Sequence, residues 1–279
     1  MPLSFPYTVR SAYQRLIAAG RSIPIALLVS LIAIIGIAWV LTLYQAVGMS
    51  GPSGAAMQDN SAAREMGGMA IDTMLSPARF GVFVMVWIVM MAGMMLPAAM
   101  PMILIFASAQ ARRKGQATIP TWIFIAGYLL VWGIAGLLVY GLTQTTPVNH
   151  RVLGGREVWA PFVLPATLII AGTYQFTPLK DVCLRHCRSP NAFVAQHWRD
   201  GRVGALEMGV QHGLYCLGCC WALFAVLVAA GMMSITWMLL LTAIIFAEKV
   251  LPHGTQTSAV VGLGFNVLAL LFAVNLQQP

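Results

Sequence analysis

A series of metal-type side chains recurs every three or four residues between Gly204 and Gly231. Its members are His212, Cys216, Cys219 and Cys220. Residues with this spacing share one face of an α-helix, so a helix here carries a stripe of imidazole and thiol groups. The rise from His212 to Cys220 is about 12 Å, too long for one ion to bind both ends. The stripe predicts either one metal ion with ligands from another helix, or a path of successive ligands. The alternative is that each Cys packs as a small apolar residue and His212 bonds a carbonyl.

A second pair of thiols, Cys183 and Cys187, lies in the basic segment 177–203, with His186 between them. On a short amphipathic helix two residues four apart share a face, with room for one ion between them. The segment therefore predicts a second metal or redox pair. The alternative is a loop of reduced thiols and basic residues at lipid headgroups.

Methionines supply a third class of sulfur ligand. The candidates in the second long apolar run are Met91, Met94 and Met95. In the same run Pro97 and Pro101 remove the helical hydrogen bonds to the carbonyls of Gly93 and Pro97. A bilayer offers these oxygens no water, so they need a cavity or a partner. Methionine is also a flexible packing residue, so core packing remains the alternative.

The charge of the assembled site favours a monovalent metal. Cu(I) bound by one thiolate and by neutral Met or His ligands carries no net charge, and soft sulfur ligands select it. Zn²⁺ with three thiolates and a neutral His leaves a negative centre, which is costly in an apolar environment such as the interior of a membrane. The residues therefore predict copper as Cu(I), with zinc as the less favoured alternative.

The elements that position these residues are membrane helices. Hydrophobic residues make up 59% and charged residues 9% of the chain, and the mean hydropathy is +0.81, which excludes a soluble globule. We predict an all-α, polytopic membrane bundle that forms a single transmembrane domain over 1–279, with about seven spans of about 20 residues each. The apolar runs are Ile23–Ala46, Phe80–Ala107, Pro120–Leu142, Val158–Phe176, Gly204–Gly231, Ser234–Val250 and Thr257–Leu276.

The distribution of Lys and Arg sets the predicted orientation. Most of the 16 basic residues fall in loops on one side of these runs, so we expect a cytoplasmic N-terminus and a periplasmic C-terminus in a bacterial inner membrane. The net charge of +8 thus reflects topology and not nucleic-acid binding. The segment 48–79 becomes an external, Met-bearing loop that could trap a soft cation. All five cysteines then lie in the cytoplasm or the bilayer, where structural disulfides are not expected.

A charged pair and a tyrosine are predicted to have structural roles. Glu248 and Lys249 end the sixth run and are expected to form a charge pair at the membrane interface. A role of Glu248 and His253 in metal entry or proton coupling is the less favoured alternative. Tyr128, in the third run, is expected to be an ordinary packing or interface aromatic.

Four motifs resemble the bacterial membrane proteins grouped as domain of unknown function 2182, which are described as predicted metal-binding integral membrane proteins. They are MMAGMMLPAAMPM from Met90, YQFTPLKDVCLRHCRSP from Tyr174, HGLYCLGCCW from His212 and AEKVLPHG from Ala247. The resemblance covers Phe80 to Gly264 and implies metal binding. It leaves out the N-terminal helix and the Met-bearing loop.

The sequence favours a metal-handling protein over an enzyme. We predict that it holds Cu(I), or passes it across or within the membrane, in exchange with a soluble carrier or a partner subunit. One alternative is a membrane thiol-disulfide oxidoreductase that works through Cys216 with Cys219 or Cys220 and through the pair Cys183 and Cys187. It would leave His212 and the methionines without a role. Another is an accessory subunit that delivers metal to a larger membrane enzyme.

Overall fold

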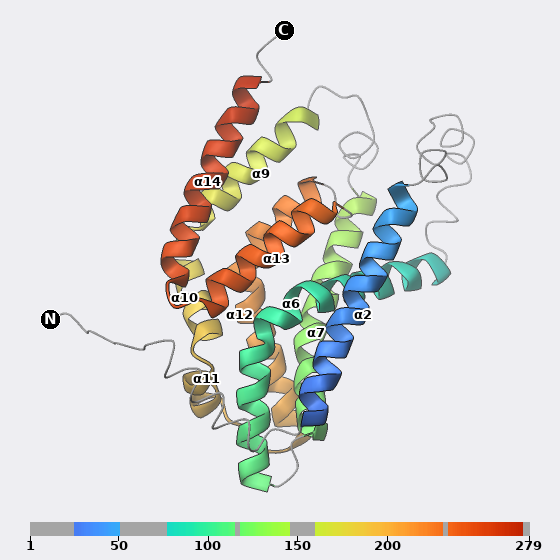
Figure 1. Cartoon of the computed structure of the whole chain (residues 1–279), viewed down its shortest axis with the longest axis vertical. Helices are drawn as coiled ribbons and strands as arrows, with labels where there is room; N and C mark the ends of the chain where they lie inside the picture. The colour runs from blue at the N-terminus through green and yellow to red at the C-terminus, as the bar shows by residue number, and fades with distance from the viewer. Residues whose placement is uncertain (1–24, 51–76, 115–117, 146–159, 231–233, 276–279) are drawn as a thin grey trace, which may run out of the picture.

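A computed structural model of the chain describes residues 25–50, 77–114, 118–145, 160–230 and 234–275. Within these ranges the regular secondary structure is entirely α-helical (Figure 1). The helices are α2 Ile25–Ser50, α6 Pro77–Lys114, α7 Thr118–Thr145, α9 Ala160–Tyr174, α10 Pro178–Arg188, α11 Pro190–Gln196, α12 Gly201–Ala230, α13 Ile235–Val250 and α14 Gly254–Asn275. This confirms the all-α prediction. Residues 51–76, most of the predicted Met-bearing loop, lie outside the described ranges.

Five of these helices, α2, α6, α7, α12 and α14, are long and apolar enough to cross a membrane. A sixth span results if α9 and α10, which meet at a bend of 69°, are counted as one broken crossing. The seventh predicted span corresponds to α13, whose 16 residues reach about 24 Å, less than the roughly 30 Å hydrocarbon core. Helix α12 ends at Ala230 and α13 begins at Ile235, and the break expected between Gly231 and Ser234 falls mostly on residues 231–233, outside the described ranges.

Helix α12 lies against α7 along a seam of glycines. A Cβ atom on Gly209 would collide with the carbonyl oxygen of Phe124, and one on Gly213 would lie 2.9 Å from Val131 Cγ2. On α7, a Cβ on Gly127 would in turn meet the backbone of Leu206. Small residues allow such close backbone approach between apolar helices, where dispersion contacts drive association. The seam fixes the rotation of α12 about its own axis, and therefore the direction in which its thiol-bearing face points.

Helix α6 changes direction part-way along its length (Figure 1), and it contains Pro97 and Pro101. Pro97 cannot donate to the carbonyl of Gly93 four residues earlier. The indole Nε1 of Trp39 on α2 donates to that oxygen instead, at 3.1 Å. The expectation that a carbonyl freed by proline needs a partner is therefore met at Gly93.

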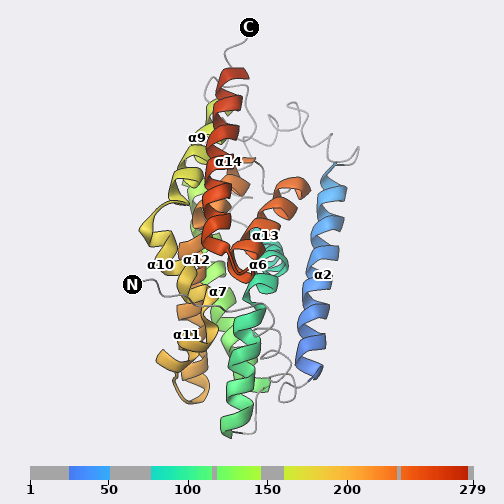
Figure 2. The same ribbon diagram turned by 60° about the vertical axis from the view of Figure 1, so that its left-hand side comes forward.

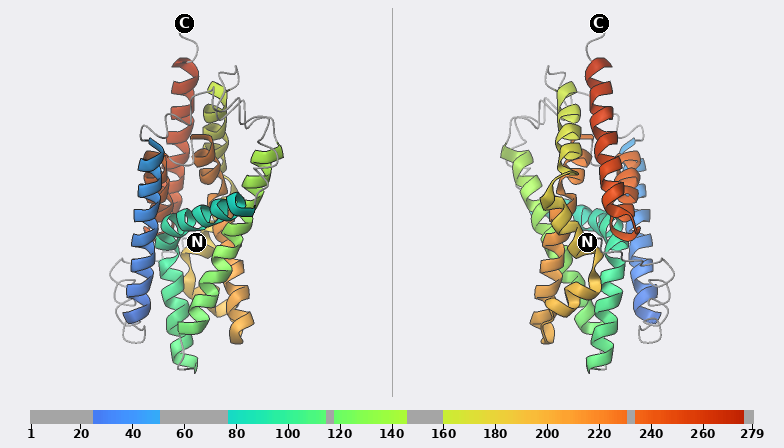
Figure 3. Two further views of the ribbon diagram at one scale, coloured as in Figure 1. Left: turned by 90° about the vertical axis from the view of Figure 1, so that its right-hand side faces the viewer. Right: turned by 90° about the vertical axis from the view of Figure 1, so that its left-hand side faces the viewer.

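The two short helices before α12 occupy the segment that the sequence placed between membrane spans. Thr177 caps α10, its hydroxyl accepting from the backbone N–H of Lys180, and Pro178 occupies the first turn, where its missing N–H costs nothing. Helix α10 packs on α12 and α13, while α9 runs beside α14 (Figures 2 and 3). The bend after α9 thus turns one amphipathic helix back onto the bundle.

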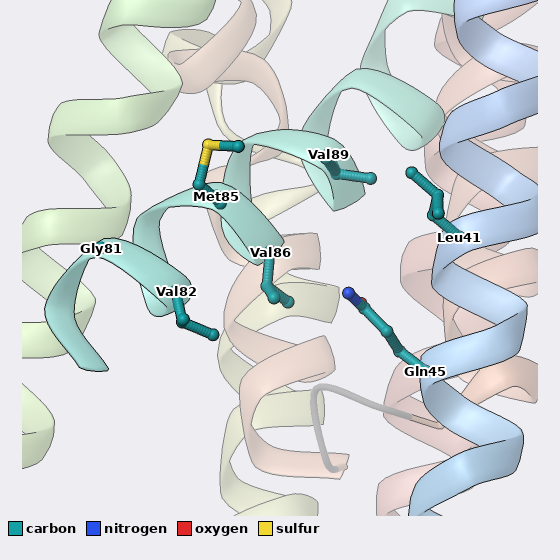
Figure 4. A pocket seen from close by; sticks show the side chains of 7 residues that line it. All are labelled: Leu41, Gln45, Gly81, Val82, Met85, Val86 and Val89. Atoms are coloured by element: carbon teal, nitrogen blue, oxygen red, sulfur yellow. The ribbon is translucent and has the colours of Figure 1, made fainter. Parts of the chain in front are cut away.

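An open groove lies between α2 and α6 (Figure 4). Its lining is apolar except for one amide side chain, and consists of Leu41, Gln45, Gly81, Val82, Met85, Val86 and Val89. Such a surface suits hydrocarbon. It offers a metal ion only the thioether of Met85.

Candidate metal centre

Helices α10 and α12 carry all five cysteines of the chain, two on α10 and three on α12. Cys216, Cys219 and Cys220 are buried in α12, and Cys183 of α10 is buried against Gly218, where a Cβ atom would lie 2.7 Å from its sulfur. Cys187 is half-buried, with its Sγ 4.0 Å from Sγ of Cys219. None of the five forms a disulfide. The two motifs treated separately in the sequence therefore form one thiol cluster.

The Cys187–Cys219 pair has the spacing of a two-sulfur metal site. With metal–sulfur bonds of about 2.3 Å, sulfurs this far apart can both bind one ion at an angle of roughly 120°. Within the described part of the chain, no group of three or more His, Cys, Asp or Glu side chains could hold a metal ion. A soft dithiol pair suits Cu(I), which accepts fewer ligands than the four of a structural zinc site.

Cys216 differs from the other thiols because it contacts a cation. The ammonium Nζ of Lys249 donates to Cys216 Sγ at 2.8 Å, and the hydroxyl of Tyr128 lies 3.0 Å from the same sulfur. The thiols of Cys219 and Cys220 donate to the Cys216 carbonyl at 3.1 and 2.8 Å. Lys249 thus offers an electrostatic partner to negative charge on the cluster, in an interior where an uncompensated charge is expensive.

His212 lies one helical turn from Cys216, in an aromatic cage. Its ring stacks on Tyr128 and Phe124, with centroid distances of 5.5 and 6.0 Å, and Phe193 meets it edge-on. Its Nδ1 atom is buried and has no hydrogen-bond partner in the described structure. A buried polar atom without a protein partner is unusual, and a metal ion or a water molecule could satisfy it. The imidazole therefore fits the ligand role that the sequence gave it.

The remaining predicted ligands are His186 on α10 and three methionines on α6. His186 stacks flat on Tyr215, with ring centroids 4.2 Å apart, and its Nδ1 is 2.8 Å from the Val182 carbonyl oxygen. The methionines of α6 that were predicted to bind metal are almost completely buried, and these are Met91, Met94 and Met95. They share the hydrophobic core with the thiols, but α6 packs mainly on α7, α2, α13 and α11.

The expected interfacial pair of Glu248 and Lys249 is wrong. Both side chains are buried, and they pair with different partners: Glu248 Oε2 with Lys180 Nζ at 2.8 Å, and Lys249 with Cys216. Neighbouring residues on a helix point about 100° apart, so they cannot face the same helix. That geometry was available from the sequence. The role of Tyr128 was also missed, and no local motif marks it.

The family model of PpoB2, described as a copper chaperone, matches residues 84–272. The chain belongs to this family. The match extends from α6 to α14 and includes every described cysteine, His212 and Lys249, whereas α2 precedes it. The resemblance to domain of unknown function 2182 is thus corrected in name, while its metal-related character is confirmed. No curated protein and no solved structure matches the chain. Membership in the PpoB2 family gives the protein a copper-related function.

Proposed function

We propose that the protein holds Cu(I) between Cys187 of α10 and Cys219 of α12 and passes it on to a partner. The observation that carries the proposal is the 4.0 Å separation of these two sulfurs, contributed by two different helices. Soft thiolates select Cu(I), and two of them suffice for it, in contrast to zinc. The single negative charge that two thiolates leave on Cu(I) has a counter-charge nearby in Lys249, which contacts Cys216. The family's description as copper chaperones supports copper as the cargo.

The neighbouring ligands provide for exchange of the ion. Cys183, Cys216 and Cys220 lie on the same two helices as the pair, and in this proposal one sulfur replaces another as the ion moves. His212 would extend this path along α12, and His186 would extend it toward the edge of α10. Three methionines are proposed as ligands on the α6 side, supported by burial in the same core, namely Met91, Met94 and Met95.

The setting we propose is a bacterial inner membrane, with the N-terminus in the cytoplasm. Five long apolar helices and the placement of Lys and Arg between apolar runs support it. The receiver of the copper would be a soluble carrier or a subunit of a larger membrane enzyme. Delivery of copper to a partner accords with chaperone activity without requiring net transport.

Titration of the full-length, detergent-solubilised protein with Cu(I), in competition with a chromogenic Cu(I) chelator, tests this assignment. Cys187→Ser and Cys219→Ser should each weaken copper affinity by at least about tenfold, equivalent to about 1.4 kcal/mol. Cys220→Ser is the matched control, because a serine hydroxyl can keep the bond to the Cys216 carbonyl. It should change the affinity less. Unchanged copper binding in the Cys187→Ser, Cys219→Ser double variant rules out the site.

The same sulfur contact also favours a second candidate, thiol-disulfide exchange. Here Cys187 and Cys219 would become a disulfide as a partner disulfide takes up their two electrons and two protons. Single-cysteine variants that trap a mixed disulfide with a partner support this function. Protection of the thiols from alkylation by Cu(I) alone supports the copper site.

A further inference from the structure

The last turn of α13 contacts both helices that carry the thiols. Glu248 pairs with Lys180 of α10, and Lys249 contacts Cys216 of α12. Because adjacent residues project about 100° apart, one short stretch of helix can reach two neighbours at once. We infer that Glu248 and Lys249 form a clamp that positions α10 against α12 and so sets the distance between Cys187 and Cys219. This inference deepens the proposed function. The positioning of α10 against α12 stands without copper, and only the role of that positioning in copper binding rests on the proposed function.

The Glu248 arm of the clamp acts on the face of α10 that presents the thiols. Lys180, Cys183, Leu184 and Cys187 stand at positions i, i+3, i+4 and i+7 of α10, so they form one stripe. Lys180 and Glu248 are 1% and 2% exposed, and the Gln175 side-chain carbonyl also accepts from Lys180. An ion pair buried so completely leaves a bare charge if either partner is removed.

Helix α10 depends on such external contacts for its position. It has 11 residues, fewer than the roughly 12–15 that make an isolated helix even marginal in water. A bend of 69° separates it from α9, so α9 does not continue into it. At its other end Arg188 donates to the carbonyls of Leu251 and Pro252, both at 2.7 Å, just after α13. Helix α10 is therefore tied to α13 near both of its ends.

The Lys249 arm joins the same turn of α13 to α12. Lys249 is 8% exposed, and its ammonium reaches the sulfur of Cys216, one turn before Cys219 and Cys220. Since α12 is already fixed on α7 by the glycine seam, this contact anchors α13 to a rigid partner. The ion pair between Glu248 and Lys180 then holds α10 against the anchored turn of α13.

Disulfide trapping reports on the separation of the two thiols and needs no copper. The full-length protein, with Cys183→Ala and Cys220→Ala, is treated with diamide, and the Cys187–Cys219 disulfide is quantified by mass spectrometry of a denatured digest. Glu248→Gln and Lys180→Met should each slow this bond by about tenfold or more, because a buried charge loses its partner. Lys249→Met should slow it as well, because it removes the hydrogen bond from α13 to Cys216. The matched control is Glu207→Gln, which breaks the exposed Arg199–Glu207 pair and should leave the rate unchanged.

Paired replacement separates positioning from general damage. The charge-reversed variant Lys180→Glu with Glu248→Lys, or the apolar pair Lys180→Met with Glu248→Leu, should form the disulfide faster than either single variant at the same positions. The clamp is overturned if the single variants react at the parent rate, or if both paired variants stay as slow as the singles. If the disulfide rates follow this pattern but the protein binds no copper, the clamp is supported and only the proposed function is ruled out.

Discussion

At the scale of single residues, Cys216 is the thiol most constrained by its surroundings. It receives a contact from Lys249 and another from Tyr128, and its carbonyl accepts from two further thiols. Cys187, by contrast, is only half-buried. This difference suggests distinct roles, with Cys216 holding the cluster together and Cys187 giving a partner access to the ion.

The hydroxyl of Tyr128 can be removed without changing the shape of the core. We expect Tyr128→Phe to lower the free energy of unfolding by about 1 kcal/mol, because it deletes one buried hydrogen bond. Tyr128→Ala should cost about 3–5 kcal/mol, since it also leaves a cavity beside His212. Unfolding of the detergent-solubilised protein by sodium dodecyl sulfate measures both.

Tyr44 provides the control for this pair, because its side chain is 79% exposed. Tyr44→Phe should leave the unfolding midpoint unchanged. A loss in Tyr128→Phe no larger than that in Tyr44→Phe would show that the contact with Cys216 contributes nothing to stability.

At the scale of elements, the proline-containing part of α6 and the indole of Trp39 on α2 depend on each other. Trp39→Phe removes the donor to the Gly93 carbonyl and should cost about 1–3 kcal/mol, because a buried oxygen loses its partner. With Pro97→Ala the backbone can supply its own donor, so Trp39→Phe should then cost less. A double-mutant cycle of unfolding free energies measures this coupling. Equal costs of Trp39→Phe with and without Pro97 would contradict it.

The elements themselves follow closely from the sequence, but their contacts do not. The apolar runs predict helices, and Gly231 to Ser234 predicts the break between α12 and α13, because these depend on local chain properties. The 3–4 spacing correctly places His212 and Cys216 on neighbouring turns. The pairing of Cys187 with Cys219, however, depends on the 69° bend and on packing of α10 against α12. No local pattern encodes that approach.

Charged residues show the same limit. Lys180 resembles one more basic residue of a loop, yet it is buried against Glu248, which is 68 positions away in the chain. Sequence patterns report which face of a helix is apolar, but an ion pair within that face depends on two helices meeting. The sequence therefore predicted the candidate ligands on α12. It did not predict the contacts that the other helices make with them.

At the scale of the whole molecule, copper should stabilise the fold by binding to the native state. With free Cu(I) at 1,000 times the dissociation constant, the free energy of unfolding should rise by about 4 kcal/mol if the unfolded chain binds none. Cys187→Ser should lose most of this gain, and a Cu(I) chelator should reverse it in the parent protein. A gain that is equal in the variant would place the stabilising copper elsewhere. Unfolding midpoints with and without Cu(I) give the answer.

The bond from Trp39 to Gly93 also bears on how the protein is made. Chains emerge N-terminus first, so α2 is synthesised before the proline-broken part of α6. The donor that completes the backbone of α6 is therefore already available when that segment enters the membrane. Because α2 lies outside the region matched by the family model, a relative that lacks an equivalent helix must find another donor during its own insertion, or carry a residue other than proline at this position.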